Sequence, residues 1–111
     1  MFENNNYKII CDDCTEVVDN LDTNVDLTFL DPPFNQDKEY ENHHDSMHDE
    51  DYWQWMTNIC EKIYNKSSNG GSIFFMQREK NTWKVQKALE DSGWTYQNLI
   101  IWKKKSSIIT L

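Results

Sequence analysis

The sequence predicts an α/β fold, because β-prone segments alternate with amphipathic helical segments along nearly the whole chain. Strands that are separated by helices form a parallel sheet, and the strand at residues 25–30 is mostly apolar on both faces, which is typical of a sheet covered on both sides. The length of 111 residues allows one domain at most, and a hydrophobic share of 38% with an aromatic share of 14% is enough for a packed core.

The first half of the chain predicts a β-α-β unit. Residues 7–11 (YKIIC) form a short β-prone run, residues 14–21 (CTEVVDNL) carry a short helical pattern, and residues 25–30 (VDLTFL) form a second strand. A polar segment, residues 35–48, follows.

The second half continues the alternation. Residues 49–66 carry one apolar stripe at spacings of three and four, and three acidic residues at the start suit the positive end of the helix dipole. The sequence SSNGG predicts the end of that helix, and residues 72–76 (SIFFM) predict a strand. Residues 81–92 then predict a helix capped by Gly93, and residues 95–102 predict a last strand.

Charge divides the chain into two parts. The net charge is −8, but the first 51 residues hold 15 acidic and two basic residues, whereas the remainder holds four acidic and nine basic residues. Cations drive binding to a phosphate backbone, so basic contacts to a nucleic acid would lie mostly outside the acidic half. Three lysines, Lys103, Lys104 and Lys105, are candidates for phosphate contacts, although such a run is as often simply solvated.

The sequence also predicts where the chain resides. It contains neither a run of 18 apolar residues nor the pattern of a secretory signal, which predicts a cytoplasmic protein with no membrane partner. Three cysteines, an odd number in a chain without a signal, fit reduced thiols better than a disulfide framework.

A rigid corner, Asp31-Pro32-Pro33-Phe34, ends the strand at residues 25–30. As a tripeptide, Asp-Pro-Pro is an ordinary turn, because proline fixes φ and forces the preceding residue into an extended conformation. Its chemistry also suits an amino group, since the two prolines remove two N–H donors. The Asp31 carboxylate and the Pro32 carbonyl are then left as acceptors beside an aromatic ring.

The chain resembles the N-terminal region of DNA amino-methyltransferases, in the class whose DPPY/F motif precedes the Gly-rich cofactor loop. The likeness extends to about Ser107 and is carried by KIICDDCTEVVDNLDTNVDLTFL, DPPFN, HHDSMHDEDYWQWM, GGSIFFMQREKNTWKV and GWTYQNLIIWKKKSS. It implies a Rossmann-like, S-adenosylmethionine-dependent methyltransferase fold that is incomplete. Residues 1–111 would provide the N-terminal part of the sheet with its flanking helices, and the cofactor-loop part would be absent.

The resemblance also implies roles for the corner. Asp31 and Pro32 would accept hydrogen bonds from the exocyclic amino group of a flipped-out base, Pro33 would fix the turn, and Phe34 would stack on the base. Acceptors on both N–H bonds favour the pyramidal nitrogen and direct its lone pair at the methyl donor. Aspartate in the first position favours adenine N6, and cytosine N4 is the alternative.

The resemblance further assigns cofactor contacts. The CDDC sequence is similar to the family's Gly-Asp-Cys, with Asp12 in place of glycine, so that Asp13 and Cys14 are candidates for contact with S-adenosylmethionine. Asp31 is a third candidate. A competing interpretation makes Cys11 and Cys14 a redox or zinc Cys-x-x-Cys motif, but a second ligand pair is missing.

A metal site is the competing interpretation of the histidines. His44 and His48 would share a helix face, near His43, Asp45 and Asp49, yet the segment lacks the glutamate of an HExxH motif. In the resembled family this segment is a loop near the substrate.

The Gly-rich cofactor loop of the resembled family has no counterpart among the glycines of this chain. None of Gly70, Gly71 and Gly93 lies in the setting of the cofactor loop. We therefore expect a truncated or split methyltransferase that acts on double-stranded DNA only as part of a complete enzyme, with a complementing C-terminal polypeptide. The alternatives are an inactive remnant or accessory subunit, and a small nucleotide-binding module in which the corner is only a turn.

Overall fold

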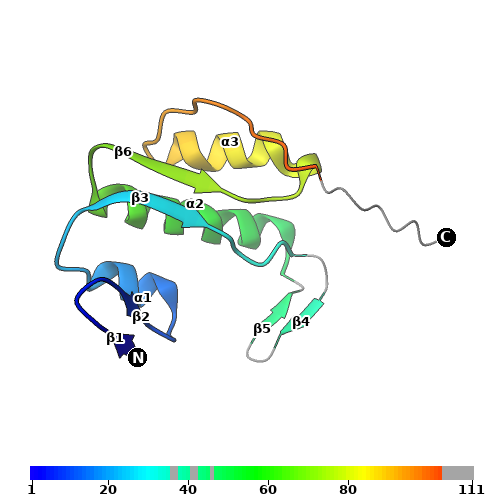
Figure 1. Cartoon of the computed structure of the whole chain (residues 1–111). Coiled ribbons are helices and arrows are strands. Elements are labelled where there is room, and N and C mark those ends of the chain that lie inside the picture. The colour runs from blue at the N-terminus through cyan, green and yellow to red at the C-terminus, as the bar shows by residue number, and fades with distance from the viewer. Residues whose placement is uncertain (36–37, 41–42, 46, 104–111) are drawn as a thin grey trace.

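A parallel pair of strands lies at the centre of the fold. The computed structural model describes residues 1–35, 38–40, 43–45 and 47–103 (Figure 1). Strand β3 (Val25–Leu30) pairs in parallel with β6 (Ser67–Phe75), and the register joins Thr28 to Ile73 and Leu30 to Phe75. The prediction of a parallel sheet is confirmed for this pair of strands.

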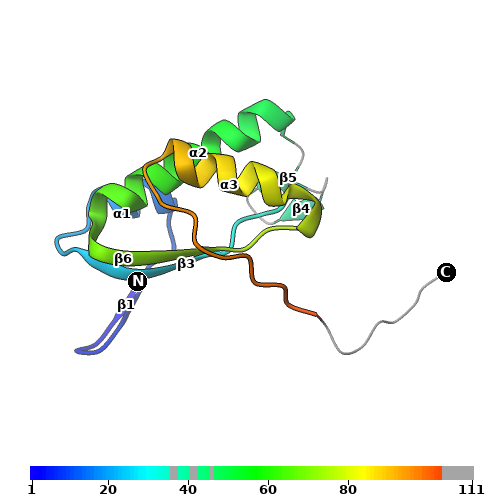
Figure 2. The same cartoon turned by 90° about the horizontal axis from the view of Figure 1, so that it is seen from above.

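Helices cover one face of this pair. The long α2 (Asp49–Lys66) connects β3 to β6 by way of the polar segment, and α3 (Thr82–Asp91) follows a 3-10 helix, η1 (Glu79–Asn81). Figure 2 shows α2 and α3 on the same side of the strands. The short α1 (Cys14–Asp19) packs against α2. The three predicted helices are thus confirmed, each within a few residues of its predicted bounds.

The core lies between the helices and the strands. The buried apolar side chains are Tyr52, Met56, Ile59, Cys60, Ile63, Val85, Ala88 and Leu89. From the strands, Leu30, Ile73 and Phe75 pack against this core. Side chains alternate between the two faces of a strand, so the intervening residues point away from the helices.

The opposite face of the strands is uncovered in the described part of the chain. Phe29 and Phe74 are neighbours in the register, and they are 63% and 44% exposed, while Leu27 is 63% exposed. The prediction of a sheet covered on both faces is wrong for the described residues. Helices α1, α2 and α3 lie on the same side of the strands, and no described helix reaches the other side (Figure 2).

The N-terminal strand pairs differently from the prediction. Strand β2 (Lys8–Ile9) forms an antiparallel hairpin with β1 (Phe2–Glu3) and does not join the parallel pair. Asn4 closes this hairpin: its Oδ1 accepts hydrogen bonds from the backbone N–H groups of Asn6 and Tyr7 at 2.7 and 2.8 Å. A local turn therefore provides the partner, and the predicted β-α-β unit is wrong in its first strand.

Two further boundaries differ. Residues 95–102, predicted as a last strand, form no strand, and their apolar side chains Leu99, Ile100, Ile101 and Trp102 are exposed. The SSNGG sequence ends α2 as predicted but belongs to β6, where the register shifts opposite Val25 and Leu27. Gly70 supplies a φ of +80°, and a Cβ on Gly71 would lie 2.9 Å from the Ser68 carbonyl oxygen, which explains glycine at this irregularity.

The end of α3 agrees with the prediction. Gly93 has a φ of +110°. Its N–H donates to the Glu90 carbonyl at 3.2 Å, and the Trp94 N–H donates to the Leu89 carbonyl at 3.0 Å. This paired arrangement is the Schellman motif, which satisfies carbonyls that the helix itself leaves without donors.

The polar segment contains a second hairpin. Strands β4 (Lys38–Tyr40) and β5 (His43–Asp45) pair antiparallel, with Tyr40 opposite His43. Among the described helices, none has both the length and the apolar character needed to cross a membrane.

Candidate functional site

The Asp-Pro-Pro-Phe corner lies at the carboxyl end of the parallel pair. β3 ends at Leu30, and the Leu30 carbonyl accepts a hydrogen bond from the Met76 N–H at 2.8 Å, one residue beyond the end of β6. The segment that begins at Asp31 therefore leaves the sheet beside the segment that begins at Gln77. In α/β sheets, ligands bind outside this edge.

The acceptors of the corner are available in the described structure. Asp31 is exposed, and no described side chain or backbone group donates a hydrogen bond to its carboxylate. Pro32, Pro33 and Phe34 are half-buried. The Pro32 carbonyl likewise has no donor among the described residues. The two acceptors predicted for an amino group are thus both uncommitted within this part of the chain.

The Pro33 carbonyl, in contrast, is occupied. It accepts a hydrogen bond from the hydroxyl of Tyr52, in the first turn of α2, and Tyr52 is only 1% exposed. The Gln77 side chain in turn donates from Nε2 to the Tyr52 oxygen at 2.9 Å. The corner is therefore linked to α2 and to the residue that follows β6.

Asn35 holds the other side of the corner. Its side chain exchanges two hydrogen bonds with the backbone of Met47: Nδ2 donates to the Met47 carbonyl at 3.0 Å, and Oδ1 accepts from the Met47 N–H at 2.7 Å. Asn35 has a φ of +60°, a left-handed conformation that asparagine adopts more readily than most residues. These bonds join the two ends of the polar segment.

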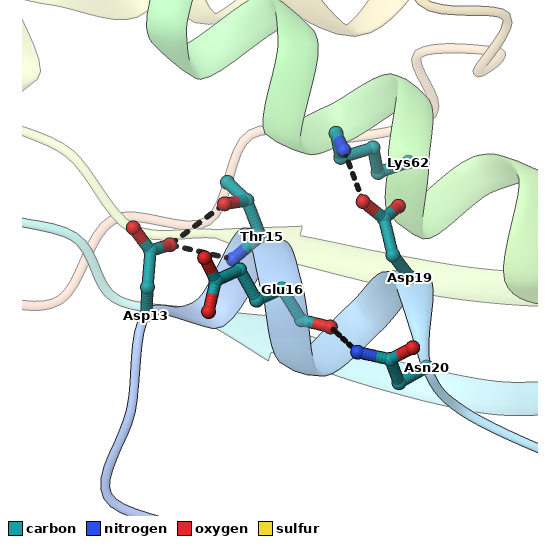
Figure 3. Close-up of polar contacts among 6 residues, drawn as sticks. All are labelled: Asp13, Thr15, Glu16, Asp19, Asn20 and Lys62. Atoms are coloured by element: carbon teal, nitrogen blue, oxygen red, sulfur yellow. Dashed lines mark hydrogen bonds and ion pairs between the residues drawn. The ribbon is translucent and has the colours of Figure 1, made fainter.

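Two of the three predicted cofactor residues, Asp13 and Cys14, lie at the start of α1, where Figure 3 shows the contacts of Asp13. The Asp13 Oδ1 accepts from the Thr15 hydroxyl at 2.7 Å and from the Thr15 N–H at 2.9 Å, so that Asp13 is the N-cap of the helix. These two bonds hold the pKa of the Asp13 carboxyl below its ordinary value. Asp19 binds Lys62 at 2.5 Å and ties α1 to α2.

Cys14 is the first residue of α1 and is exposed. Desolvation of its thiol raises the pKa, and the neighbouring Asp13 carboxylate raises it further. A reactive or metal-binding thiol needs a lowered pKa, so this setting does not favour the redox interpretation. All three cysteines are free.

No described contact joins Asp13 or Cys14 to Asp31. α1 runs antiparallel to β3 (Figure 1), and its N-terminus is thus directed toward the end of the sheet where the corner lies. With Oδ1 used in the cap, Asp13 keeps Oδ2 as an acceptor for a hydroxyl or amino group. An open hollow lined by Lys8, Glu16 and Asp22 lies beside α1, and no residue of the corner lines it.

The histidines do not share a helix face. His43 and His44 lie in β5, and their side chains are outside the described residues, as are Lys104 and Lys105. His48 is the N-cap of α2, where its Nδ1 accepts from the Glu50 N–H at 3.4 Å. Among the residues that the structure describes, no group of three or more histidine, cysteine or acidic side chains could hold a metal ion.

Sequence reasoning missed three residues of the site. Asn35 directly follows the motif but received no role, Tyr52 is part of the apolar stripe of residues 49–66, and Gln77 was not singled out. A signal exists for Tyr52, because a tyrosine at a fully buried position needs a partner for its hydroxyl. Nothing in the sequence identifies that partner.

Comparison with known proteins places the chain in a family. Residues 25–110 match the DNA methylase family, and the chain belongs to that family. It is also similar to the type II methyltransferase M.HpaI of Haemophilus parainfluenzae, with 28% identity over 97 residues. That match covers 86% of this chain but 31% of the relative, so the chain spans about a third of the relative's length. No solved structure matches the chain.

Proposed function

We propose that this chain provides the amine-binding corner of a site-specific DNA adenine-N6 methyltransferase of a restriction-modification system. The observation that carries the proposal is the corner itself: Asp31 and Pro32 present uncommitted acceptors at the carboxyl end of the parallel strands, in a member of the DNA methylase family. The name of the Haemophilus relative, a type II methyltransferase, supports the biological setting.

The chemistry follows from the acceptors. The amino nitrogen of adenine is a poor nucleophile because its lone pair is delocalised into the ring. Hydrogen bonds from its two N–H groups to the Asp31 carboxylate and the Pro32 carbonyl favour the pyramidal nitrogen, which is the form that reacts. Phe34 stacks on the flipped-out base and offsets part of its cost of unstacking.

S-adenosylmethionine supplies the electrophilic methyl group. Asp13, through its second carboxylate oxygen, and Cys14 are the residues of this chain that would contact it at the start of α1, and Asp31 is the third candidate for such a contact. The complete cofactor pocket also needs a Gly-rich loop, which we assign to a complementing C-terminal polypeptide. The whole enzyme has a Rossmann-like fold, acts on double-stranded DNA and resides in the cytoplasm.

The test has two arms. The 111-residue chain alone is expected to transfer no labelled methyl group from S-adenosylmethionine to DNA above background. Supplying the part of the Haemophilus relative that lies outside the match, in trans or as a fusion, is expected to restore transfer. Robust transfer by the chain alone would contradict the assignment of the cofactor loop to a second part.

In the restored enzyme, Asp31→Ala is expected to lower the rate of methyl transfer on the order of 100-fold with DNA affinity largely retained, because the carboxylate acts mainly in the transition state. Asp22→Ala, which removes an exposed carboxylate between α1 and β3, is the matched control and is expected to leave the rate unchanged. Equal rates in the two variants would remove Asp31 from the mechanism. Comparing adenine and cytosine substrates in the same assay decides between N6 and N4.

A second candidate function is that of an inactive accessory subunit. The uncovered apolar face with Leu27, Phe29 and Phe74 favours it, because such a face suits a protein partner. Failure of every complementing part to restore transfer, with a stable complex formed, would support this alternative.

A further inference from the structure

Phe34 is flanked on both sides by anchored residues. Pro33, immediately before it, is fixed through its carbonyl by the Tyr52 hydroxyl, and Asn35, immediately after it, is fixed through its side chain by the Met47 backbone. Phe34 itself is half-buried. The aromatic ring is thus attached to a backbone that is restrained at both neighbours, by bonds to residues 19 and 12 positions away.

The anchor on the Pro33 side is itself held. The rings of Trp53 and Trp55 lie edge-on to the Tyr52 ring, with centroids 5.2 and 6.0 Å away. The Gln77 Oε1 accepts from the Arg78 N–H at 3.0 Å and from the Asn81 side chain at 3.4 Å. These bonds fix the orientation of the Gln77 amide, so that Nε2 faces the tyrosine oxygen and the phenol proton is left for Pro33.

The anchor on the Asn35 side uses both ends of one amide. Its pair of bonds with Met47 has the donor and acceptor pattern of a backbone pair in a sheet. Met47 immediately precedes His48, the N-cap of α2, and Tyr52 lies in the first turn of the same helix. Both anchors therefore lead to the N-terminal end of α2.

We infer that Tyr52 and Asn35 are positioning residues that hold Phe34 in place for stacking on the target base. The inference rests on the proposed function for the identity of the base, but the restraint on Phe34 is a property of this chain alone. Stacking requires a ring that is already in position, because a ring that must be ordered on binding loses part of the favourable free energy.

The test uses a fluorine label on the ring of Phe34. Phe34 is replaced by 4-fluorophenylalanine in the 111-residue chain, and its ¹⁹F resonance is recorded. At a concentration below that of self-association, we expect a single narrow line. In Tyr52→Phe, which keeps the buried ring and removes the hydroxyl, we expect a broadened line or a second line of comparable intensity. Tyr64→Phe is the matched control, because Tyr64 packs edge-on against Trp94 instead, and we expect it to leave the line unchanged.

Asn35→Gly is the second variant. Glycine accepts the φ of +60° without strain, so that only the side-chain bonds to Met47 are lost. We expect the same broadening or doubling as in Tyr52→Phe. This variant keeps the test decisive if circular dichroism shows that Tyr52→Phe fails to fold.

A second measurement tests the link to the base. Adding a trinucleotide with a central adenine is expected to move the Phe34 resonance through the ring current of the stacked base. The midpoint of this titration is expected to lie about tenfold higher in Tyr52→Phe, as the loss of one well-formed hydrogen bond permits, and within twofold of the original in Tyr64→Phe.

The possible results distinguish the positioning roles of Tyr52 and Asn35 from the stacking role of Phe34. An unchanged narrow line in both Tyr52→Phe and Asn35→Gly overturns the positioning roles. Broadened lines in those variants, with no movement on adding the trinucleotide to the original chain, retain the restraint but overturn the stacking role of Phe34. The proposed function itself is tested separately, by methyl transfer in the completed enzyme. Broadening together with the titration shifts supports both.

Discussion

Pro32 and Pro33 are adjacent and identical, yet their carbonyl groups have different surroundings. The Pro33 carbonyl is bound by Tyr52, whereas the Pro32 carbonyl meets no donor among the described residues. A bound carbonyl is a fixed point for the backbone, and an unbound one is an acceptor for a ligand. The rigid corner thus combines one residue with a bound carbonyl and one residue with an open carbonyl.

Cys60 provides a test of the core at the scale of one residue. The thiol is 0% exposed, and burial raises its pKa from 9.0 to about 12. As the pH rises from about 9 toward 12, the unfolded chain loses this proton and the folded chain keeps it. The free energy of unfolding is then expected to fall by up to about 1.4 kcal/mol per pH unit through this group.

The measurement is denaturant unfolding at several pH values in parallel with Cys60→Ala, whose slope lacks this contribution. The difference between the two slopes is free of the contributions of the exposed Cys11 and Cys14 and of the lysine and tyrosine side chains, because both proteins contain these groups. Equal slopes in the two proteins would mean that Cys60 ionises in the folded state and is less buried than described.

The end of α3 is the element where prediction and structure agree in detail, and it allows a comparison of two glycines. Gly93→Ala forces alanine into a φ of +110° and places its Cβ 3.0 Å from the Tyr64 ring. We expect a loss of at least about 1 kcal/mol in the free energy of unfolding.

Gly70→Ala is the control for that prediction. Gly70 has a φ of +80°, but a Cβ there meets nothing within 4 Å, so that only backbone strain is added. We expect Gly70→Ala to destabilise the chain less than Gly93→Ala in the same urea titration. The reverse order would show that Tyr64 moves away freely.

Elements with a local cause were predictable, and elements that depend on distant partners were not. The apolar stripe of α2 and the glycine cap of α3 each depend on residues that are close together in the sequence. The pairing of β2 with β1 was missed. The β-prone pattern of residues 7–11 predicts a strand, but it does not identify the strand with which it pairs. Residues 95–102 carry the pattern of a strand but have no paired neighbour in the structure.

The same distinction holds for the candidate site. Asp31, Pro32 and Phe34 were identified because the motif is contiguous and follows a strand. Tyr52 and Gln77 come from two other elements, and only the packing of α2 against the end of the sheet brings them to Pro33. Their contribution is a matter of tertiary structure, for which a single sequence contains no direct signal.

At the scale of the whole molecule, the uncovered face of the strands governs behaviour in solution. Leu27, Phe29 and Phe74 lie on this face, and all three are exposed. Each large apolar side chain left in water forfeits about 1.5–3 kcal/mol, against a total stability of about 5–15 kcal/mol for a typical domain. We therefore expect the isolated chain to self-associate.

Sedimentation over a concentration series measures this. Phe29→Ser combined with Phe74→Ser is expected to shift the chain toward the monomer, because both rings lie on the uncovered face. Trp83→Ser, which removes an equally exposed ring at 64% from α3, is the matched control and is expected to leave the association unchanged. A monodisperse monomer of ordinary stability at all concentrations would contradict the expectation.

The links of Pro33 to Tyr52 and of Tyr52 to Gln77 also set an order of events during synthesis. The corner leaves the ribosome first, its direct anchor follows 19 residues later, and Gln77 follows a further 25 residues later. β6, the strand beside β3, is complete only at Phe75, just before Gln77. Because translation adds about 5–20 residues per second, Tyr52 follows the corner after about 1–4 seconds and Gln77 follows later still. The rigidity of the corner is therefore expected to be acquired late, at about the time that the parallel pair closes.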